Sequence, residues 1–367
     1  MELIMKSNSN KPMAKVYFKS VKQGATASEI AACNLELIMK LEPFSKIKAK
    51  DFVAIKMHFG DINNIGHIKP ESVKLLADAI KAKKARPFLV ETSTLYVGER
   101  SNAYDHINIA YKHGFTYEKT GAPIIMADGL LGHSQTAVKI NGKHSKEIFV
   151  ASDVAHYDFL ICLNHVTGHM ITGVGAAIKN LGMGLAARGG KLSQHSGALP
   201  SINEKKCVKC GRCQMFCPAG AISPGEAAFK IDSAKCIGCG ECIAICKKEA
   251  VKFSWKQTSK IVQEKMAEHA LGVISGKSEH LLLTNHIIHV TKECDCAAEA
   301  DPRVIDDIGI LASTDPVALD KASVDIVKKI HGYPFDYESK NPLNPMFQLE
   351  HGQKIGLGTM NYELIEV

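Results

Sequence analysis

The chain has 367 residues, 46% of them apolar and 23% charged, a balance that excludes a disordered or collagen-like protein. No apolar run approaches the roughly 18 residues that cross a bilayer, and the first residues lack the apolar core of a signal peptide. We therefore expect a cytoplasmic protein with no membrane partner. The net charge of +7 comes from scattered basic residues, so we expect no nucleic-acid partner either.

The first 200 residues alternate between short apolar runs and amphipathic stretches. Helical spacing of apolar residues predicts helices at 70–80 and 103–111. Apolar runs predict strands at 51–57, 87–90, 123–126 and 157–163. This alternation indicates an α/β domain with a mostly parallel sheet.

Polar side chains follow several of these strands. In open α/β sheets ligands bind beyond the carboxyl ends of the strands, so such residues are candidates for a site. His58 and His165 are the predicted acid–base groups, with Lys179 as a third catalytic candidate. For each residue alone, the alternative is a hydrogen-bonded side chain that packs a loop. The candidates after the strands are His58, Asp61, Glu91, Thr92, Ser93, Asn164, His165 and His169.

The segment 165–191 is rich in glycine and also holds Lys179, Arg188 and Lys191. Glycines can leave backbone N–H groups bare for an anion, and a cation can complete such a site. The G-x4-G-K-[ST] order of a P-loop is missing. The structural alternative is that small residues let a helix lie close to the sheet. The predicted cofactor-binding residues are Gly173, Gly175, Lys179, Asn180, Gly182 and Gly184.

Eight of the twelve cysteines lie between Cys207 and Cys246. They form two copies of the pattern C-x2-C-G-x-C-x3-C, an internal duplication. The first three cysteines of each copy are expected in a tight loop relaxed by Gly211 or Gly240, and the fourth on a short helix that points away. The fourth cysteine then ligates the other cluster of a two-[4Fe–4S] arrangement.

The repeat therefore predicts two ligand sets. The first is Cys207, Cys210, Cys213 and Cys246, and the second is Cys236, Cys239, Cys242 and Cys217. Zinc is the alternative, although a zinc ribbon does not need the third cysteine of each copy. A Pro-Gly turn predicts a hairpin at 222–231. Lys247 stands in the second copy where the first copy has Pro218, and because a positive charge raises the reduction potential of a nearby cluster, the two clusters are expected to differ in potential. This segment resembles the bacterial two-[4Fe–4S] ferredoxin domain over about residues 201–255.

The α/β alternation resumes after the cysteines. A helix is predicted at 259–273, a strand at 280–290, and a strand-to-helix unit at 308–322. The expected organisation is an α/β host with a mostly parallel sheet in two parts, 1–200 and 256–367, and an inserted α+β ferredoxin-like domain at 201–255. Cys294 and Cys296 follow the late strand, and we leave open whether they bind a further metal, lie near a cluster or are two reduced thiols in a loop.

Several motifs together resemble one family. They are H-F-G-D from His58, G-A-A-I-K-N-L-G-M-G from Gly175, C-D-C from Cys294 and D-I-G-I-L-A-S-T-D-P-V-A from Asp307. With the cysteine repeat, they are similar to the uncharacterised Fe–S centre proteins of the domain-of-unknown-function 362 family, over nearly the whole chain. The resemblance implies a cytoplasmic bacterial or archaeal protein with [4Fe–4S] clusters, and no reaction. The glycine-rich segment, with His165, His169 and Lys179, is also similar to the cofactor-binding region of nickel-dependent lactate racemases, which would imply a nickel cofactor.

Three functions are compatible with this organisation. The first is an oxidoreductase in which the two clusters relay electrons between a redox partner protein and a small-molecule substrate, anionic ligand or further metal in the host. The second is a non-enzymatic electron-transfer or adaptor subunit, and the third a redox sensor. Residues 201–255 carry nine basic and five acidic groups, near neutrality once two clusters are counted. A freely diffusing carrier uses a stronger surface charge, so the first function is favoured. The substrate and the oligomeric state are not predicted.

Overall fold

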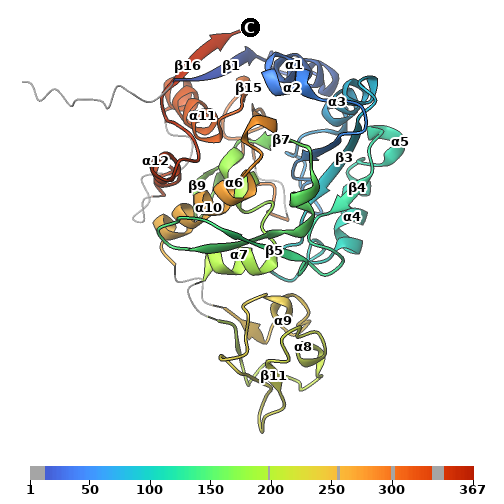
Figure 1. The fold of residues 1–367 in the computed structure, drawn as a ribbon, viewed down its shortest axis with the longest axis vertical. Helices are drawn as coiled ribbons and strands as arrows, with labels where there is room; N and C mark the ends of the chain where they lie inside the picture. Colours follow the sequence, from blue (N-terminus) through green and yellow to red (C-terminus); the bar gives the residue numbers. More distant parts are fainter. Residues whose placement is uncertain (1–12, 197–198, 254–256, 299–301, 333–342) are drawn as a thin grey trace, which may run out of the picture.

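The computed structural model describes residues 13–196, 199–253, 257–298, 302–332 and 343–367. A sheet of eight strands forms the centre of the host (Figure 1). Every neighbouring pair is parallel except the two that involve β15. The predicted mostly parallel α/β sheet is therefore confirmed. The strand order is β16 (Tyr362–Glu366), β1 (Ala14–Ser20), β15 (Gly309–Ser313), β14 (Leu281–Ile287), β7 (Phe159–His165), β2 (Phe52–Lys56), β3 (Arg86–Glu91), β4 (Ile124–Met126).

The central strands are apolar on both faces because helices cover both. Val53 and Ile55 of β2 belong to one core, whereas Ala54 between them belongs to the other. This alternation follows from the two-residue period of a strand. The helices on the side of the core that contains Val53 and Ile55, hereafter the first core, are α1 (Ala27–Lys40), α2 (Glu42–Lys46), α3 (Pro70–Ala82), α4 (Ala103–Lys112) and α5 (Tyr117–Thr120). Those on the second are α6 (Ala177–Gly182), α10 (Ser259–Val273), α11 (Pro316–His331) and α12 (Met346–Ile355).

Local chemistry explains where the predicted helices begin. The side chain of Thr258 accepts from the amide of Ile261 at the start of α10. Asp315 accepts from the amides of Val317 and Ala318, and Pro316 occupies the first position of α11. None of the helices in the described part of the chain has both the length and the apolar character that a membrane span requires.

The strand order reverses between β2 and β7. From β2 the chain builds outward through β3 to β4, and it then returns to place β7 and β14 on the other side of β2. The loops that leave the carboxyl ends of β2 and β7 therefore diverge, which opens the crevice where ligands bind in sheets of this type. Two hairpins that the sequence did not predict lie on the second face: β5 (Gln135–Lys139) with β6 (Glu147–Ala151), and β8 (Thr167–His169) with β9 (Gly173–Gly175).

Residues 201–253 form a small separate lobe, hereafter the cysteine lobe, which hangs beside α7 (Arg188–His195) (Figure 1). Its ends meet where β10 (Ser201–Ile202) pairs with β13 (Val251–Lys252). The predicted hairpin is β11 (Ile222–Ser223) with β12 (Lys230–Ile231). Two short helices, α8 (Arg212–Met215) and α9 (Glu241–Ala244), occupy equivalent places in the two copies of the repeat.

Candidate functional site

A cavity of about 450 Å³ lies at the carboxyl ends of the central strands. His58 lines it from beyond β2, Glu91 from the end of β3, and His165 from the end of β7. Cys294 and Cys296 enter it from the long loop after β14. Four strands thus contribute groups to one cavity, as the strand-end positions of these residues suggested.

The predicted cofactor-binding residues of the glycine-rich segment divide into those that line the cavity and those that pack elsewhere. Gly175, Lys179, Asn180 and Gly184 line the cavity, together with the predicted His58 and His165. Gly182 instead faces α10, where an added Cβ would lie 2.1 Å from the carbonyl oxygen of Met266. Gly173 has a φ of +72°, and a Cβ there would lie 2.5 Å from the carbonyl oxygen of Leu343. For these two glycines the close-packing interpretation fits the structure better than ligand binding.

The first amides of α6 already have an anionic partner. Ala177 and Ile178 donate to the two carboxylate oxygens of Asp320, each at 2.9 Å. Asp320 belongs to α11 and is buried, and it also accepts from Asn285 at 2.8 Å. These two N–H groups are therefore not available to a ligand.

Four cations line the cavity, namely Lys56, Arg100, Lys179 and Lys191. Lys56 is fully buried and donates to Glu91 at 2.7 Å and to Asn180 at 2.6 Å. Lys191 donates to the Thr92 hydroxyl at 2.6 Å, and burial lowers the pKa of Lys191 to about 8. The lining carboxylates are Glu91, Glu293 and Asp295. Because the cations outnumber the carboxylates, the cavity favours an anionic ligand.

His165 is held by Asp295, a residue that the sequence did not single out. The Nδ1 atom lies 2.9 Å from the Asp295 carboxylate, and Nε2 lies 2.8 Å from the carbonyl oxygen of Ile288. Both partners accept, so both ring nitrogens donate when the ring is protonated. Burial alone would lower the pKa of His165, but the Asp295 carboxylate outweighs it and the pKa is raised. The raised pKa favours the protonated ring, whose two N–H groups are both directed at these acceptors.

His58 has a different environment. Arg100 Nη1 lies 2.9 Å from its Nε2, and the amide nitrogen of Gly60 lies 2.9 Å from its Nδ1; a neutral ring accepts only one of these two hydrogen bonds. Arg100 also donates to Asp61 at 2.7 Å and to the Tyr96 hydroxyl at 2.7 Å. Burial, followed by the charge of Arg100, holds the pKa of His58 well below its usual range. His58 is therefore neutral, and its contacts position Arg100 at the cavity.

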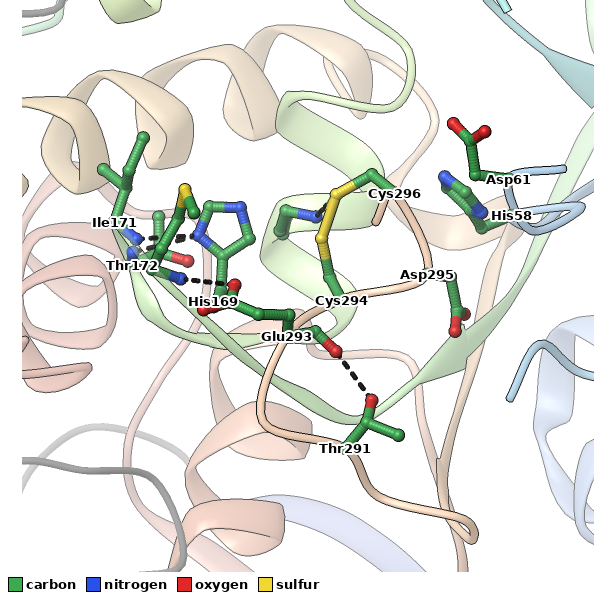
Figure 2. The surroundings of a disulfide bond; sticks show 12 residues. His58, Asp61, His169, Ile171, Thr172, Thr291, Glu293, Cys294, Asp295 and Cys296 are labelled. Carbon is green, nitrogen blue, oxygen red and sulfur yellow. Dashed lines mark hydrogen bonds between the residues drawn. A yellow bond between two sulfur atoms is a disulfide. The ribbon is translucent and has the colours of Figure 1, made fainter. Parts of the chain in front are cut away.

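Cys294 and Cys296 form a disulfide (Figure 2). The sequence left this pair as metal ligands or reduced thiols, and the bond was not predicted. A ring nitrogen of His169 lies within 4.8 Å of both sulfur atoms, and Lys179 Nζ lies 3.9 Å from Cys296 Sγ. Burial lowers the pKa of Lys179 to about 8. The only sequence signal for this arrangement was the spacing of two cysteines at a strand end.

The cysteine lobe contains two further cavities. One, of about 190 Å³, is lined by Cys207, Cys210, Cys213 and Cys246. The other, of about 20 Å³, is lined by Cys217, Cys236, Cys239 and Cys242. Each lining contains all four cysteines of one ligand set expected from the repeat. Apolar side chains, among them Ile222, Phe229 and Val251, pack around them.

Backbone geometry repeats between the two copies. Gly211 and Gly240 have φ values of +77° and +73° and precede α8 and α9. The third cysteine of each copy lies on its helix, and the fourth follows the helix, so the expected helical place of the fourth cysteine is wrong by a few residues. Four residues beyond each fourth cysteine, an amide donates to its sulfur: Ala221 to Cys217 Sγ and Ala250 to Cys246 Sγ, both at 3.3 Å.

The second copy of the repeat contacts the host beside the large cavity. Arg188 Nη1 lies 2.5 Å from the Glu241 carboxylate, and the exposed fractions of these side chains are 1% and 2%. A Cβ added to Gly240 would lie 3.0 Å from Leu95 Cδ1. Leu95 lines the large cavity and also packs with the apolar side chains of the lobe. The Leu95 side chain thus contacts both the second cysteine loop and the cavity.

Comparisons with known proteins add a family but no reaction. A family model described as "Domain of unknown function (DUF362)" matches residues 53–325. No curated protein matches the chain. The apoprotein of lactate racemase from Thermoanaerobacterium thermosaccharolyticum is 10% identical, with a TM-score of 0.42 over 86% of this chain and 57% of that one. A Thermotoga maritima protein from a structural genomics programme is 9% identical, with a TM-score of 0.43 over 85% of this chain and 61% of that one. This chain spans less than two thirds of either structure.

Proposed function

This chain belongs to the domain-of-unknown-function 362 family, and we propose that it is an iron–sulfur oxidoreductase. Two [4Fe–4S] clusters in the cysteine lobe would supply one-electron transfer between a redox partner and the host cavity. The observation that supports the proposal most strongly is an agreement between the repeat spacing in the sequence and the positions of the cysteines in the lobe. The linings of the two lobe cavities contain the two ligand sets that the repeat spacing predicts.

The surroundings of the cysteines fit such clusters. An amide that donates to a cysteine sulfur, as Ala221 and Ala250 do, stabilises the negative charge of a ligated thiolate. The apolar packing around the sulfurs limits solvent access. Burial raises the pKa of the Cys213 and Cys239 thiols, so thiolates at these places need a nearby cation such as iron.

The two ligand sets face different surroundings. The set with Cys236, Cys239 and Cys242 belongs to the loop that packs on Leu95 and Arg188 of the host. In the other set Cys210 is exposed, and its neighbours Val208 and Met215 have exposed fractions of 59% and 78%. Exposed apolar side chains of this kind suit transient docking. A redox partner would therefore meet the set with Cys210, and the other set would face the ligand.

The ligand in the host cavity would be a small anion held by side chains. Arg100 and Lys179 supply positive charge, and the protonated ring of His165, which Asp295 orients, adds to it. Residues His58 and Asp61 keep the Arg100 guanidinium in place. The catalytic role predicted for His58 thus becomes one of positioning, whereas those of His165 and Lys179 remain direct. The proposal includes no nucleic-acid partner and no membrane partner.

The proposal is tested by matched cysteine variants of the full chain purified without oxygen. Cys210→Ser and Cys239→Ser should each lose about half of the iron, because each removes one ligand set. The two variants should leave different electron paramagnetic resonance spectra after reduction. Cys33→Ser, which changes a free cysteine in the host, is the control and should keep all the iron. Full iron in both lobe variants would contradict the ligand assignment.

A further inference from the structure

We propose that the Cys294–Cys296 disulfide is a redox centre of the host cavity, which accepts two electrons and two protons and becomes a dithiol. The S–S bond breaks and two S–H bonds form, and the reverse reaction returns both electrons and both protons. The electrons come from a low-potential one-electron donor by way of the cysteine lobe, so the inference rests on the proposed function. The clusters deliver electrons one at a time, whereas most organic ligands are reduced by two electrons. A disulfide that stores two electrons as a dithiol would connect these two processes.

The disulfide does not serve as a structural staple. Its cysteines are two residues apart, so the bond closes a very short loop and removes little chain entropy from the unfolded state. The ten other cysteines form no disulfide, and eight of them are the proposed cluster ligands. Where most thiols of a chain stay reduced, a single disulfide is usually catalytic or sensing. Cys294 has an exposed fraction of 6%, yet both cysteines line the cavity, which shields the pair from bulk thiols while exposing it to a ligand.

Lys179 is placed to stabilise the reduced form. Its ammonium nitrogen lies 3.9 Å from Cys296 Sγ, within the cavity. When the S–S bond breaks, negative charge develops on sulfur, and a neighbouring ammonium favours the thiolate over the disulfide. The same ammonium can then give up a proton to that sulfur.

His169 presents a hydrogen-bond donor to the sulfurs. The amides of Ile171 and Thr172 both donate to its Nδ1 atom, each at 3.1 Å. A neutral ring whose Nδ1 accepts must carry its proton on Nε2. Figure 2 shows these amides on one side of the ring and the disulfide on the other. A metal would need the lone pair of Nε2, so this tautomer favours proton donation over a Cys–Cys–His metal site.

The test follows thiols and clusters separately in the anaerobic, iron-loaded full chain. The chain is reduced with a photoreduced flavin, quenched with N-ethylmaleimide, and the peptide with residues 294–296 is weighed by mass spectrometry. Cluster bleaching is read in the same sample before the quench. Cys33 is free and partly exposed, so its label reports the efficiency of the quench in every sample. The inference predicts two added labels on the peptide after reduction and none before.

Bleached clusters with an unlabelled peptide would overturn the inference and leave the proposed function standing. A chain without iron would refute the proposed function, and equal labelling of the wild type and Cys239→Ser would refute delivery through the lobe. Zinc retained by the pair, with labels blocked in both states, would also overturn the inference. Lys179→Met should slow labelling at least about tenfold without slowing cluster bleaching, and Lys179→Arg should restore much of the rate.

Discussion

The buried ion pair between Arg188 and Glu241 joins the cysteine lobe to the host, and Glu241→Gln tests its importance. The glutamine keeps the size of the side chain but removes its charge. Arg188 then retains only neutral acceptors, the carbonyl oxygens of Thr94 and Ser101, in a site where its exposed fraction is 1%. Breaking a buried pair in this way costs about 3–5 kcal/mol of stability.

That cost converts into a measurable shift of the thermal midpoint. Unfolding entropy is about 2.1 cal/mol/K per residue, so a chain of 367 residues that unfolds as one unit has roughly 0.8 kcal/mol/K. The midpoint of Glu241→Gln should therefore fall by about 4–6 °C. The assay is anaerobic circular dichroism on heating, with limited proteolysis to detect release of the lobe.

A double variant supplies the control for this prediction. Arg188→Met with Glu241→Leu removes both charges and fills the space with apolar atoms, so it should be more stable than Glu241→Gln alone. A midpoint that stays within about 1 °C of the wild type in Glu241→Gln would refute the reasoning, because it would mean that the pair is compensated by solvent.

Three further changes test the site. Asp295→Asn should lower the pKa of His165, since that carboxylate is what raises it. The pKa of Asp295 is depressed and that of His165 is raised, so the pair stabilises the fold only while both groups are charged. The stability lost in this variant should therefore be largest between about pH 4, above the usual Asp pKa, and the raised pKa of His165, and small outside that window. Chemical denaturation at several pH values measures this loss. Gly182→Ala should destabilise the host by about 1–3 kcal/mol, because its Cβ meets the carbonyl of Met266, and an unchanged denaturation midpoint would count against close packing of α6 on α10. Lys179→Met should weaken binding of small anions about tenfold in calorimetric titrations, whereas Lys354→Met, at an exposed position, should not.

The sequence predicted the elements of the host well because each depends on local patterns. The run at 157–163 became β7, and the helical spacing at 259–273 became α10 with the same bounds. The position of the cavity also followed from the sequence, since the carboxyl ends of parallel strands meet at one edge. The strand of the predicted strand-to-helix unit at 308–322 became β15, but its antiparallel direction was not predicted, because the pattern of a buried strand does not record its direction.

The contacts inside the site were harder to predict because they join distant residues. Arg100 bonds Asp61 and the carbonyl of Cys296, and neither spacing leaves a periodic signal. The glycine-rich segment shows the same limit. Gly175 and Gly182 have similar neighbours in sequence, yet one lines the cavity and the other packs on α10. Whether a glycine lines the cavity or packs on a helix depends on the helix opposite, and α10 comes about eighty residues after Gly182 in the chain.

The central claim is that the cysteine lobe holds two [4Fe–4S] clusters, and the most direct test is the iron and acid-labile sulfide content of the full chain purified without oxygen. We expect about eight iron atoms and about eight sulfides per chain. Zinc near two per chain, with no sulfide, would contradict the claim, because the same cysteines would then form two structural zinc sites.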